Sequence, residues 1–286
     1  MYLVFGDTFG CCIPGSGGPG SAGDWRSNTI AVSTDHDPGS GLHFDTMLTD
    51  RPGHAREILA KSPGCVTVIP TNGVAIGSRM LLHYMDVKRW GDPGKWDLDK
   101  SGLAVSDDDG QSWTKDTPVK WSGESNFGQV AFVKSGEHLY LFGIPGGRFG
   151  QVRLARVPQA QHLDLARYEY FTGTSGKEPI WASNENFAVQ IVEAPVGELS
   201  VMWNEYLQRL IMTYLNDEKD RLEIRESPAL WGPWQPPLTL VSTYPGLYGA
   251  FLHPWYVENG GETIYFSMSL WSTYAVYWMK ARLERA

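Results

Sequence analysis

The sequence predicts an all-β protein, and three observations lead to that class. Short apolar or alternating runs recur along the whole chain and end at Gly, Pro, Asn or Asp, which is the pattern of strands and turns. The chain holds 32 Gly and 18 Pro residues, so we expect frequent turns rather than long helices. Its 12 Trp residues are roughly three times ordinary usage. They supply large apolar side chains for packing or for binding.

The expected strands follow one another with regular spacing. In chain order they cover residues 2–5, 29–32, 65–69, 80–85, 102–105, 129–133, 138–142, 152–156, 198–203, 210–215, 222–225 and 263–270. Only residues 55–60 and 159–166 have a brief helical pattern.

These strands group into a recurring unit. The units cover residues 1–44, 73–114, 127–171, 198–241 and 249–283. Repeats of about 40–50 residues with several strands each are typical of a β-propeller. We therefore expect one five-bladed β-propeller domain over residues 1–286, with a β-sandwich as the alternative.

One motif supports the propeller. Residues 106–113 fit the pattern Ser-x-Asp-x-Gly-x-Ser/Thr-Trp, the Asp-box turn of sialidase-like propellers. In such a turn the Asp carboxylate binds backbone amides, Gly takes a positive φ and Trp packs on the hairpin. A calcium loop is the alternative, because Asp107, Asp108 and Asp109 are adjacent carboxylates.

The first blade is expected to be incomplete. Residues 2–5 end at Gly6-Asp7 much as residues 82–85 end at Asp86, so they match the second strand of a blade. The innermost strand of that blade would come either from residues 274–283 or from a segment upstream of Met1, and we expect the upstream segment. Its absence would leave an unpaired strand edge.

Composition excludes several classes of protein. The net charge is −8 and no basic stripe is present, which argues against a nucleic-acid partner. No apolar run reaches about 18 residues, so no membrane span is expected. Cys11, Cys12 and Cys65 are too few for a disulfide framework, and one bridge to Cys65 or buried free thiols both remain open. The Gly-x-Gly-x-x-Gly run at residues 15–20 does not open a helix and is expected to be a flexible loop.

The candidate site lies where propellers bind substrates, at the mouth of the central channel. Inner strands begin at this end and second strands return to it. The polar residues that this rule brings together are Asp7, Asn72, His83, Asp86, Asn126, Gln129, Arg148, Glu198 and Tyr248. Two or three acids among neutral polar groups and aromatics suit glycoside hydrolysis, which uses one protonated and one ionised carboxyl group. For His83 and for His253, a core position with a backbone hydrogen bond is the alternative.

Several sequence strings resemble one family. They are Phe5-Gly6-Asp7-Thr8-Phe9, Ser27-Asn28-Thr29-Ile30-Ala31, Ile69-Pro70-Thr71-Asn72-Gly73, Leu82-His83-Tyr84-Met85, Asn126-Phe127-Gly128-Gln129, Gly197-Glu198-Leu199-Ser200-Val201, Gly232-Pro233-Trp234 and Leu247-Tyr248-Gly249-Ala250. The chain resembles a domain of secreted actinobacterial and actinophage tail proteins that was long catalogued without a function. That domain is similar to the endo-D-arabinanases of glycoside hydrolase family 183.

The resemblance implies a five-bladed propeller that hydrolyses internal α-D-arabinofuranosyl linkages of mycobacterial-type arabinogalactan and lipoarabinomannan. It implies a catalytic carboxyl at Asp7 and a second acid upstream of the Gly-Asp-Thr segment, which has no counterpart after Met1. Glu198 is our candidate for a second acid within this chain. The remaining residues that we expect to bind substrate are Asn28, Asn72, His83, Asp86, Asn126, Gln129, Arg148, Tyr248 and His253.

The resemblance also bears on partners and location. It implies a cell-wall polysaccharide as the partner, an extracellular or virion-associated location, and a place in a larger tail or secreted assembly. No cofactor or metal is expected, with calcium in the channel as the alternative. A non-catalytic carbohydrate-binding propeller is the alternative function.

Overall fold

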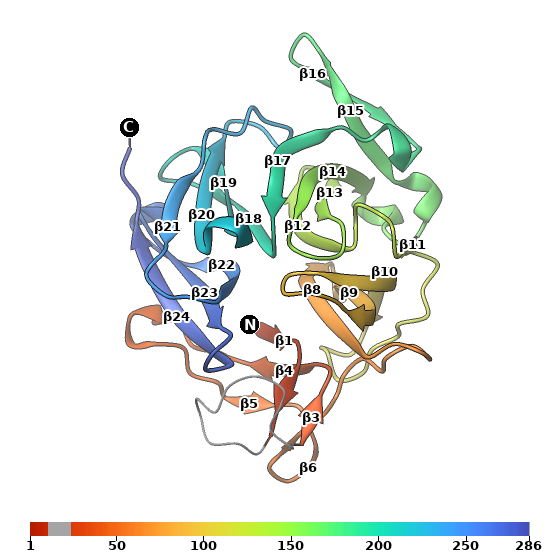
Figure 1. Ribbon diagram of the computed structural model, residues 1–286, viewed down its shortest axis with the longest axis vertical. Helices are drawn as coiled ribbons and strands as arrows, with labels where there is room; N and C mark the ends of the chain where they lie inside the picture. The colour runs from red at the N-terminus through yellow and green to blue at the C-terminus, as the bar shows by residue number, and fades with distance from the viewer. Residues whose placement is uncertain (11–23, 286) are drawn as a thin grey trace.

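The computed structural model describes residues 1–10 and 24–285. This part of the chain forms 24 strands and six short 3₁₀-helices and contains no α-helix. The long sheets are arranged as five blades around a central channel (Figure 1). The predicted five-bladed propeller is therefore confirmed. Cys11, Cys12 and the glycine run at residues 15–20 lie outside the described residues.

Each blade is an antiparallel sheet built from strands that lie close together in the sequence. Blade 1 consists of β1 (Tyr2–Phe5), β4 (Thr29–Val32) and β5 (Thr46–Met47). Blade 2 consists of β8 (Thr67–Ile76), β9 (Arg79–Trp90), β10 (Trp96–Ser106) and β11 (Lys120–Ser122). Blade 3 consists of β12 (Gln129–Ser135), β13 (His138–Ile144), β14 (Gly150–Pro158), β15 (Glu169–Ser175), β16 (Glu178–Ala182) and β17 (Gln190–Val196). Blade 4 consists of β18 (Leu199–Asn204), β19 (Arg209–Asn216), β20 (Arg221–Ser227) and β21 (Leu238–Val241). Blade 5 consists of β22 (Leu247–Glu258), β23 (Thr263–Leu270) and β24 (Ala275–Arg282).

The remaining elements are short. Two small two-stranded sheets pair β2 (Thr8–Phe9) with β3 (Trp25–Arg26) and β6 (Thr49–Arg51) with β7 (His54–Ala55). The 3₁₀-helices are η1 (Pro38–Ser40), η2 (Gln159–Gln161), η3 (Leu165–Arg167), η4 (Glu185–Phe187), η5 (Asp217–Lys219) and η6 (Asn259–Gly261). None of the described helices is long and apolar enough to cross a membrane.

The core lies between neighbouring blades, and strand alternation explains why. Along β13, Leu139 and Leu141 pack in the cluster shared with blade 2, whereas Tyr140 and Phe142 pack in the cluster shared with blade 4. Because successive side chains of a strand point to opposite faces, one apolar strand contributes to two interfaces. This is the reason that the predicted strands are apolar at nearly every position instead of alternating with polar residues.

The inner strands β8, β12, β18 and β22 run side by side around the channel. They begin at the same end, where loops that follow second strands also arrive. Glu198, just before β18, pairs with Arg148, which follows β13, and that guanidinium lies over the ring of Tyr248 at the start of β22. We call this end of the channel the mouth.

Blade 1 differs from the others in its innermost position. β1 contacts β8, and Asp7 after β1 bonds to Thr67 at the start of β8, so β1 runs toward the mouth and opposite to the inner strands. Its direction and its pairing with β4 are those of a second strand, as the sequence predicts. Residues 274–283 do not fill the inner position, because β24 pairs with β23 in blade 5.

The Asp box at residues 106–113 has the predicted geometry. The Asp108 carboxylate accepts hydrogen bonds from the backbone amide and the hydroxyl of Ser112 and from the hydroxyl of Ser106. Gly110 has a φ of +78°, and the Trp113 indole donates to the Gly110 carbonyl. Since Asp108 is engaged in this turn, the motif is structural in this protein.

Three sequence expectations need correction. Residues 55–60 are not helical, because the Asn28 amide group holds the backbone of residues 58 and 59 by three hydrogen bonds. Residues 159–166 contain the helical turn η2 and the start of η3 rather than one helix. Blade 3 is also larger than residues 127–171, since the β15–β16 hairpin extends outward and β17 returns to pair with β14 (Figure 1).

Candidate active site

An arginine between two acids occupies the mouth. Arg148 lies in the loop between β13 and β14, and its Nε and Nη2 donate to Oε1 of Glu198 at 3.0 and 2.9 Å. Its Nη1 lies 3.4 Å from Oδ1 of Asp217, the first residue of η5 after β19. The three side chains are 18%, 16% and 24% exposed. Burial alone would lower the pKa of Arg148, but the two carboxylates outweigh it and raise that pKa.

Aromatic rings enclose this guanidinium. Cζ of Arg148 lies 5.8 Å from the ring centroid of Trp96 and 5.2 Å from that of Tyr248, within cation–π range. Because Oε1 of Glu198 accepts both arginine donors, the orientation of the carboxylate is fixed. Its Oε2 is buried and takes no hydrogen bond from the described residues. Oε2 therefore keeps an unused acceptor lone pair, although the folded protein shields this atom from solvent.

Asp7 is the second acid of the mouth and has a different environment. Its Oδ1 accepts hydrogen bonds from the Thr67 hydroxyl at 2.7 Å and from the Trp25 indole at 3.1 Å. Burial raises the pKa of the Asp7 carboxyl; the two hydrogen bonds lower it in part, and the charge of Glu57 raises it further. Asp7 therefore holds a proton more readily than an exposed aspartate does.

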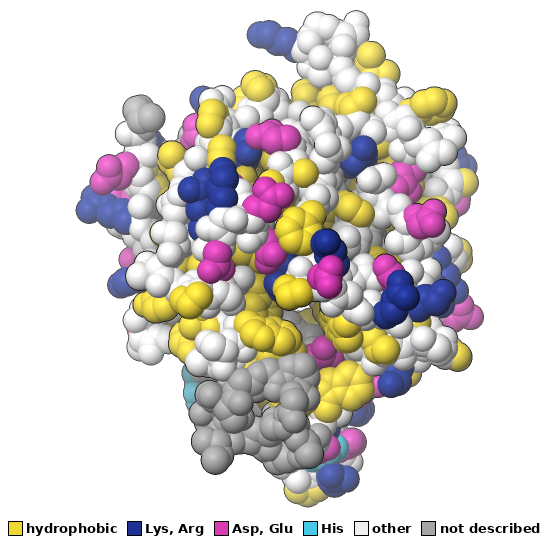
Figure 2. Space-filling model, in the orientation of Figure 1, with side chains coloured by type: hydrophobic (Ala, Val, Ile, Leu, Met, Phe, Trp, Pro, Cys, Tyr) yellow, Lys and Arg dark blue, Asp and Glu magenta, His cyan; other side chains and the backbone are white. Residues whose placement is uncertain are grey.

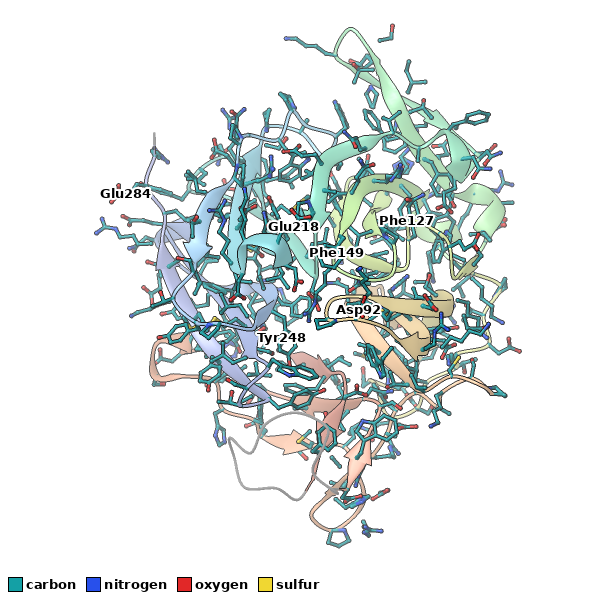
Figure 3. The ribbon with its side chains drawn as sticks, viewed as in Figure 1. Asp92, Phe127, Phe149, Glu218, Tyr248 and Glu284 are labelled. Atoms are coloured by element: carbon teal, nitrogen blue, oxygen red, sulfur yellow. The ribbon has the colours of Figure 1, made fainter. Side chains whose placement is uncertain are left out.

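Tyr248 connects the two acids electrostatically. Burial raises the pKa of Tyr248 to about 12, and the charges of Glu198 and Asp7 act in the same direction while Arg148 opposes them. The phenol therefore stays protonated at neutral pH, and a hydrogen bond with the Ser269 side chain offsets part of the rise in its pKa. Figure 3 places Tyr248, Phe149 and Asp92 close to the channel.

An aromatic cluster adjoins Asp7. The ring of Tyr274 packs edge-to-face on Phe9 and Trp271, at centroid distances of 5.4 and 5.7 Å. Burial raises the pKa of the Tyr274 phenol, and the Asp7 charge raises it further, which places the two groups near each other. Figure 2 shows hydrophobic side chains interspersed with acidic and basic ones around a hollow near the centre of the face in view. Such surfaces suit sugar rings, which have apolar faces and polar edges.

Four predicted residues thus come together at the mouth: Asp7, Arg148, Glu198 and Tyr248. Gln129 holds the loop that carries Arg148, because its side-chain amide donates hydrogen bonds to the carbonyls of Pro145 and Gly147 in that loop.

Three predicted residues lie inside blade 2 or at its edge instead. Asp86 is fully buried and pairs with Lys115 at 2.6 Å, so it links β9 to the loop between β10 and β11. His83 is also fully buried and bonds to the Thr71 hydroxyl and the Phe127 carbonyl. Burial lowers the pKa of His83 to about 3, which keeps the ring neutral. Asn72 lies within β8 and accepts from the Phe132 amide of β12 at 3.3 Å.

The other predicted residues form hydrogen bonds or ring contacts within the protein. Asn28 uses its amide group on the backbone of residues 58, 59 and 68. Asn126 bonds to Glu185 and to Arg153. His253 packs on Trp278, and burial lowers its pKa to about 4. We leave these residues out of the candidate site.

Several mouth residues were missed from the sequence. Asp217 follows β19 directly, so the rule that placed Asp7 and Arg148 at second-strand ends could have found it. Thr67, Trp25 and Tyr274 carry no such signal, because their importance depends on a contact with Asp7. The described residues bring no three His, Cys, Asp or Glu side chains together at a metal-binding spacing.

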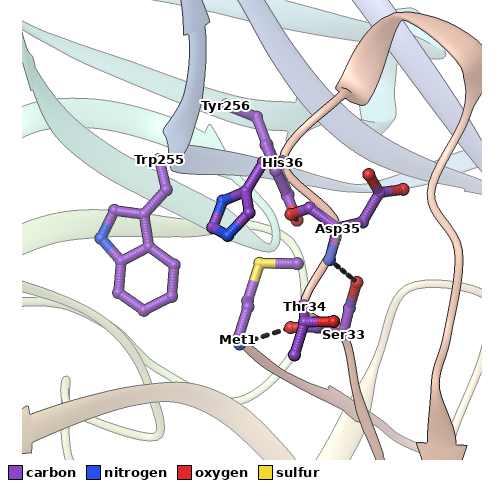
Figure 4. Close-up of a pocket in the computed structure, with 7 residues that line it drawn as sticks. All are labelled: Met1, Ser33, Thr34, Asp35, His36, Trp255 and Tyr256. Atoms are coloured by element: carbon purple, nitrogen blue, oxygen red, sulfur yellow. Dashed lines mark hydrogen bonds between the residues drawn. The ribbon is translucent and has the colours of Figure 1, made fainter.

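A hollow of about 420 Å³ lies away from this site. Met1, Thr34, His36 and Trp255 are among the residues around it (Figure 4). Since β1 runs from Met1 toward the mouth, this hollow is at the other end of the channel from Asp7.

The fold and the mouth together define a five-bladed β-propeller with acidic and aromatic side chains gathered at one end of its channel. The chain belongs to the family described as domain of unknown function DUF4185, whose model matches residues 1–280.

The chain is also similar to the notoamide biosynthesis cluster protein J of Aspergillus sp. (strain MF297-2). The two are 27% identical over 224 residues, which is 72% of this chain and 56% of that protein. The chain thus spans little more than half the length of this curated relative.

Solved structures share the fold. A putative hydrolase from Bacteroides ovatus superposes with a TM-score of 0.66 at 14% identity, over 97% of this chain and 81% of that one. A GH43_1 enzyme from Xanthomonas citri gives 0.53 at 14% identity, over 91% and 78%. An endo-arabinase from Bacteroides thetaiotaomicron gives 0.52 at 13% identity, over 91% and 86%.

Proposed function

We propose that this protein is a glycoside hydrolase that cleaves internal α-D-arabinofuranosyl linkages of mycobacterial-type cell-wall arabinan. The observation that carries the proposal is the pair of unlike acids at the mouth, Asp7 with a raised pKa and Glu198 held by Arg148. Cleavage of a glycosidic bond requires two carboxyl groups in different protonation states, one neutral and one ionised. The resemblance of the sequence strings to endo-D-arabinanases supports the choice of substrate, and so does a fold shared with a solved endo-arabinase.

Asp7 acts as the general acid. Because Thr67 and Trp25 both donate to Oδ1, the proton of the neutral carboxyl resides on Oδ2. Oδ2 protonates the glycosidic oxygen as the C–O bond breaks, and the leaving chain departs with a free hydroxyl. Asp7 is then a carboxylate.

Glu198, which Arg148 holds through Oε1, acts on the other face of the sugar ring. It either removes a proton from the attacking water or bonds to the anomeric carbon, and the separation of the two carboxyl groups decides between inversion and retention. Tyr248 donates a hydrogen bond to a sugar hydroxyl between the two acids. This polymer is exposed in the cell envelope, so we propose that the protein works outside the cell or on a virion.

A polysaccharide panel tests the proposal. The full chain is incubated with mycobacterial arabinogalactan, plant α-L-arabinan and xylan, and released oligosaccharides are separated by chromatography. We expect D-arabino-oligosaccharides from the first polymer only, and none with the Asp7→Asn or Glu198→Gln variants. Binding of arabinogalactan without release by the folded parent would identify a carbohydrate-binding propeller instead. Release from xylan or L-arabinan alone would contradict the substrate.

A further inference from the structure

Two loops beside the mouth form a groove that the proposed chemistry does not use. Residues 91–95 connect β9 to β10, and residues 145–149 connect β13 to β14. Between them lies a hollow of about 270 Å³, lined in part by Trp96, Phe149 and Pro145. This volume is just below the usual range for small-ligand pockets, and it is compatible with one or two sugar rings.

The groove is preformed, because backbone contacts hold the two loops together. The Arg148 amide donates to the Gly94 carbonyl at 2.9 Å. Gly94 has a φ of +75°, and a Cβ at this position would lie 2.9 Å from both the Phe149 ring and Oδ2 of Asp217. Only glycine allows this close approach. The groove therefore needs no rearrangement to accept a ligand.

The surface of the groove is aromatic and partly open to solvent. Phe149 is 36% exposed, and Trp90, which packs edge-to-face on Trp96 at 5.9 Å, is 47% exposed. The nearby charges are of both signs, since Lys95 lies 3.8 Å from Asp92. Neighbouring exposed aromatic rings mark binding surfaces, and balanced charges favour a neutral ligand over an ionic one.

The groove is continuous with the candidate active site. The Trp96 ring that lines it also lies over the Arg148 guanidinium, and that guanidinium holds Glu198. A neutral polymer bound at Asp7 and Glu198 would therefore extend over Trp96 and Phe149 toward blades 2 and 3.

We propose that this groove is a glycan subsite for a neutral sugar residue of the same chain, beyond the residue whose bond is cleaved. This inference rests on the proposed function. The subsite binds the apolar face of the sugar on Phe149 and Trp96, and it makes the protein favour long chains over short oligosaccharides.

The variants Phe149→Ala and Phe149→Leu test the subsite, and Trp203→Ala is the matched control. Trp203 is 46% exposed and lies five residues beyond Glu198 along β18, about 17 Å from the mouth. Binding of D-arabino-oligosaccharides of increasing length is measured by isothermal titration calorimetry, and hydrolysis of the same series by chromatography. Melting temperatures establish that each variant is folded.

We expect Phe149→Ala to weaken the binding of long oligosaccharides roughly tenfold, because the sugar no longer buries the face of one aromatic ring. Phe149→Leu is expected to lose less, while the shortest substrates and the Trp203→Ala control are unchanged. If Phe149→Ala binds oligosaccharides of every length as tightly as the parent does, or loses the same affinity at every length, the subsite is overturned while the proposed hydrolysis stands. Length-dependent binding without hydrolysis by the parent would support the subsite and overturn the proposed function.

Discussion

The Thr67 hydroxyl should control how readily Asp7 ionises, and Thr67→Val isolates that effect. Thr67 is buried at the start of β8, and its hydroxyl donates to Oδ1 of Asp7 at 2.7 Å. Valine keeps the shape of the side chain and removes the donor. The hydrogen bond favours the ionised carboxylate over the neutral acid, so its loss raises the pKa of Asp7 beyond the value that burial sets.

The size of this change follows from the energies of the two protonation states. A hydrogen bond to a charged acceptor contributes about 1.5–3 kcal/mol, and one to a neutral acceptor about 0.5–1.5 kcal/mol. The difference is roughly 1–1.5 kcal/mol, and one pKa unit corresponds to about 1.36 kcal/mol. We therefore expect the pKa of Asp7 to rise by about one unit in Thr67→Val.

Carboxyl ¹³C chemical shifts of Asp7 as a function of pH measure this pKa without any need for activity. In hydrolysis, the basic limb of the kcat/KM profile should move to higher pH by the same amount, because Asp7 must be protonated to act as the acid. Thr213→Val is the matched control, since this buried hydroxyl donates at 2.7 Å to the Ala250 carbonyl in another part of the fold. An unchanged or lowered Asp7 pKa in Thr67→Val, or an equal rise in Thr213→Val, would show that the Thr67 hydroxyl does not control this pKa.

Three further predictions follow from the charges of the described residues. Asp7→Asn should abolish hydrolysis and raise the free energy of unfolding at pH 7. The gain in stability arises because the raised pKa of Asp7 in the folded protein makes its ionised carboxylate unfavourable at that pH. Chemical denaturation at a series of pH values should show that this gain disappears as the pH falls below about 4, where the carboxyl is protonated in the unfolded chain as well. Arg148→Met should lower the free energy of unfolding by about 2 kcal/mol, less than the roughly 3–5 kcal/mol for breaking a fully buried ion pair, because its acidic partners are partly exposed. The variant should also reduce kcat/KM at least about tenfold, because Glu198 loses its orientation. An unchanged kcat/KM would exclude a role of Arg148 in orienting Glu198. Asp108→Asn should destabilise the protein at neutral pH without changing hydrolysis, because hydrogen bonds from Ser112 lower the pKa of Asp108 to about 2. The difference in free energy of unfolding between variant and parent should narrow as the pH falls from about 4 to about 2. A difference that stays constant over this range would contradict a structural role for the ionised Asp108 carboxylate.

The fold was predictable because blade packing leaves a local signature. Strands such as residues 138–142 contact two neighbouring blades and are therefore apolar at successive positions. The Asp box is similarly local, since the side-chain hydrogen bonds of Asp108 and Trp113 lie within residues 106–113. The extension β15–β17 was not predicted. Its segments carry exposed charges and prolines, and their pairing with β14 depends on contacts distant in sequence.

The candidate site was predictable where strand direction alone places a residue. Asp7, Arg148 and Glu198 were found because inner strands start and second strands end at the mouth. Asp86 was misplaced because the sequence ends its strand at Met85. In the structure β9 continues to Trp90, which leaves Asp86 inside the sheet.

Misplaced and missed residues share one cause. Asn72 was predicted to lie at the start of a strand, but β8 begins at Thr67, so Asn72 lies in the middle of that strand. Trp25 reaches Asp7 only through the folded hairpin, across 18 positions of sequence. Such contacts depend on tertiary structure, and a local pattern does not encode them.

In the proposed function, Asp7 at the mouth protonates a glycosidic bond of D-arabinan. The most direct test incubates the purified parent and its Asp7→Asn variant with mycobacterial arabinogalactan and follows released oligosaccharides over time. We expect D-arabino-oligosaccharides from the parent and none from the variant, although both fold and both bind the polymer. Equal release by the two proteins, or no release by the folded parent, would contradict it.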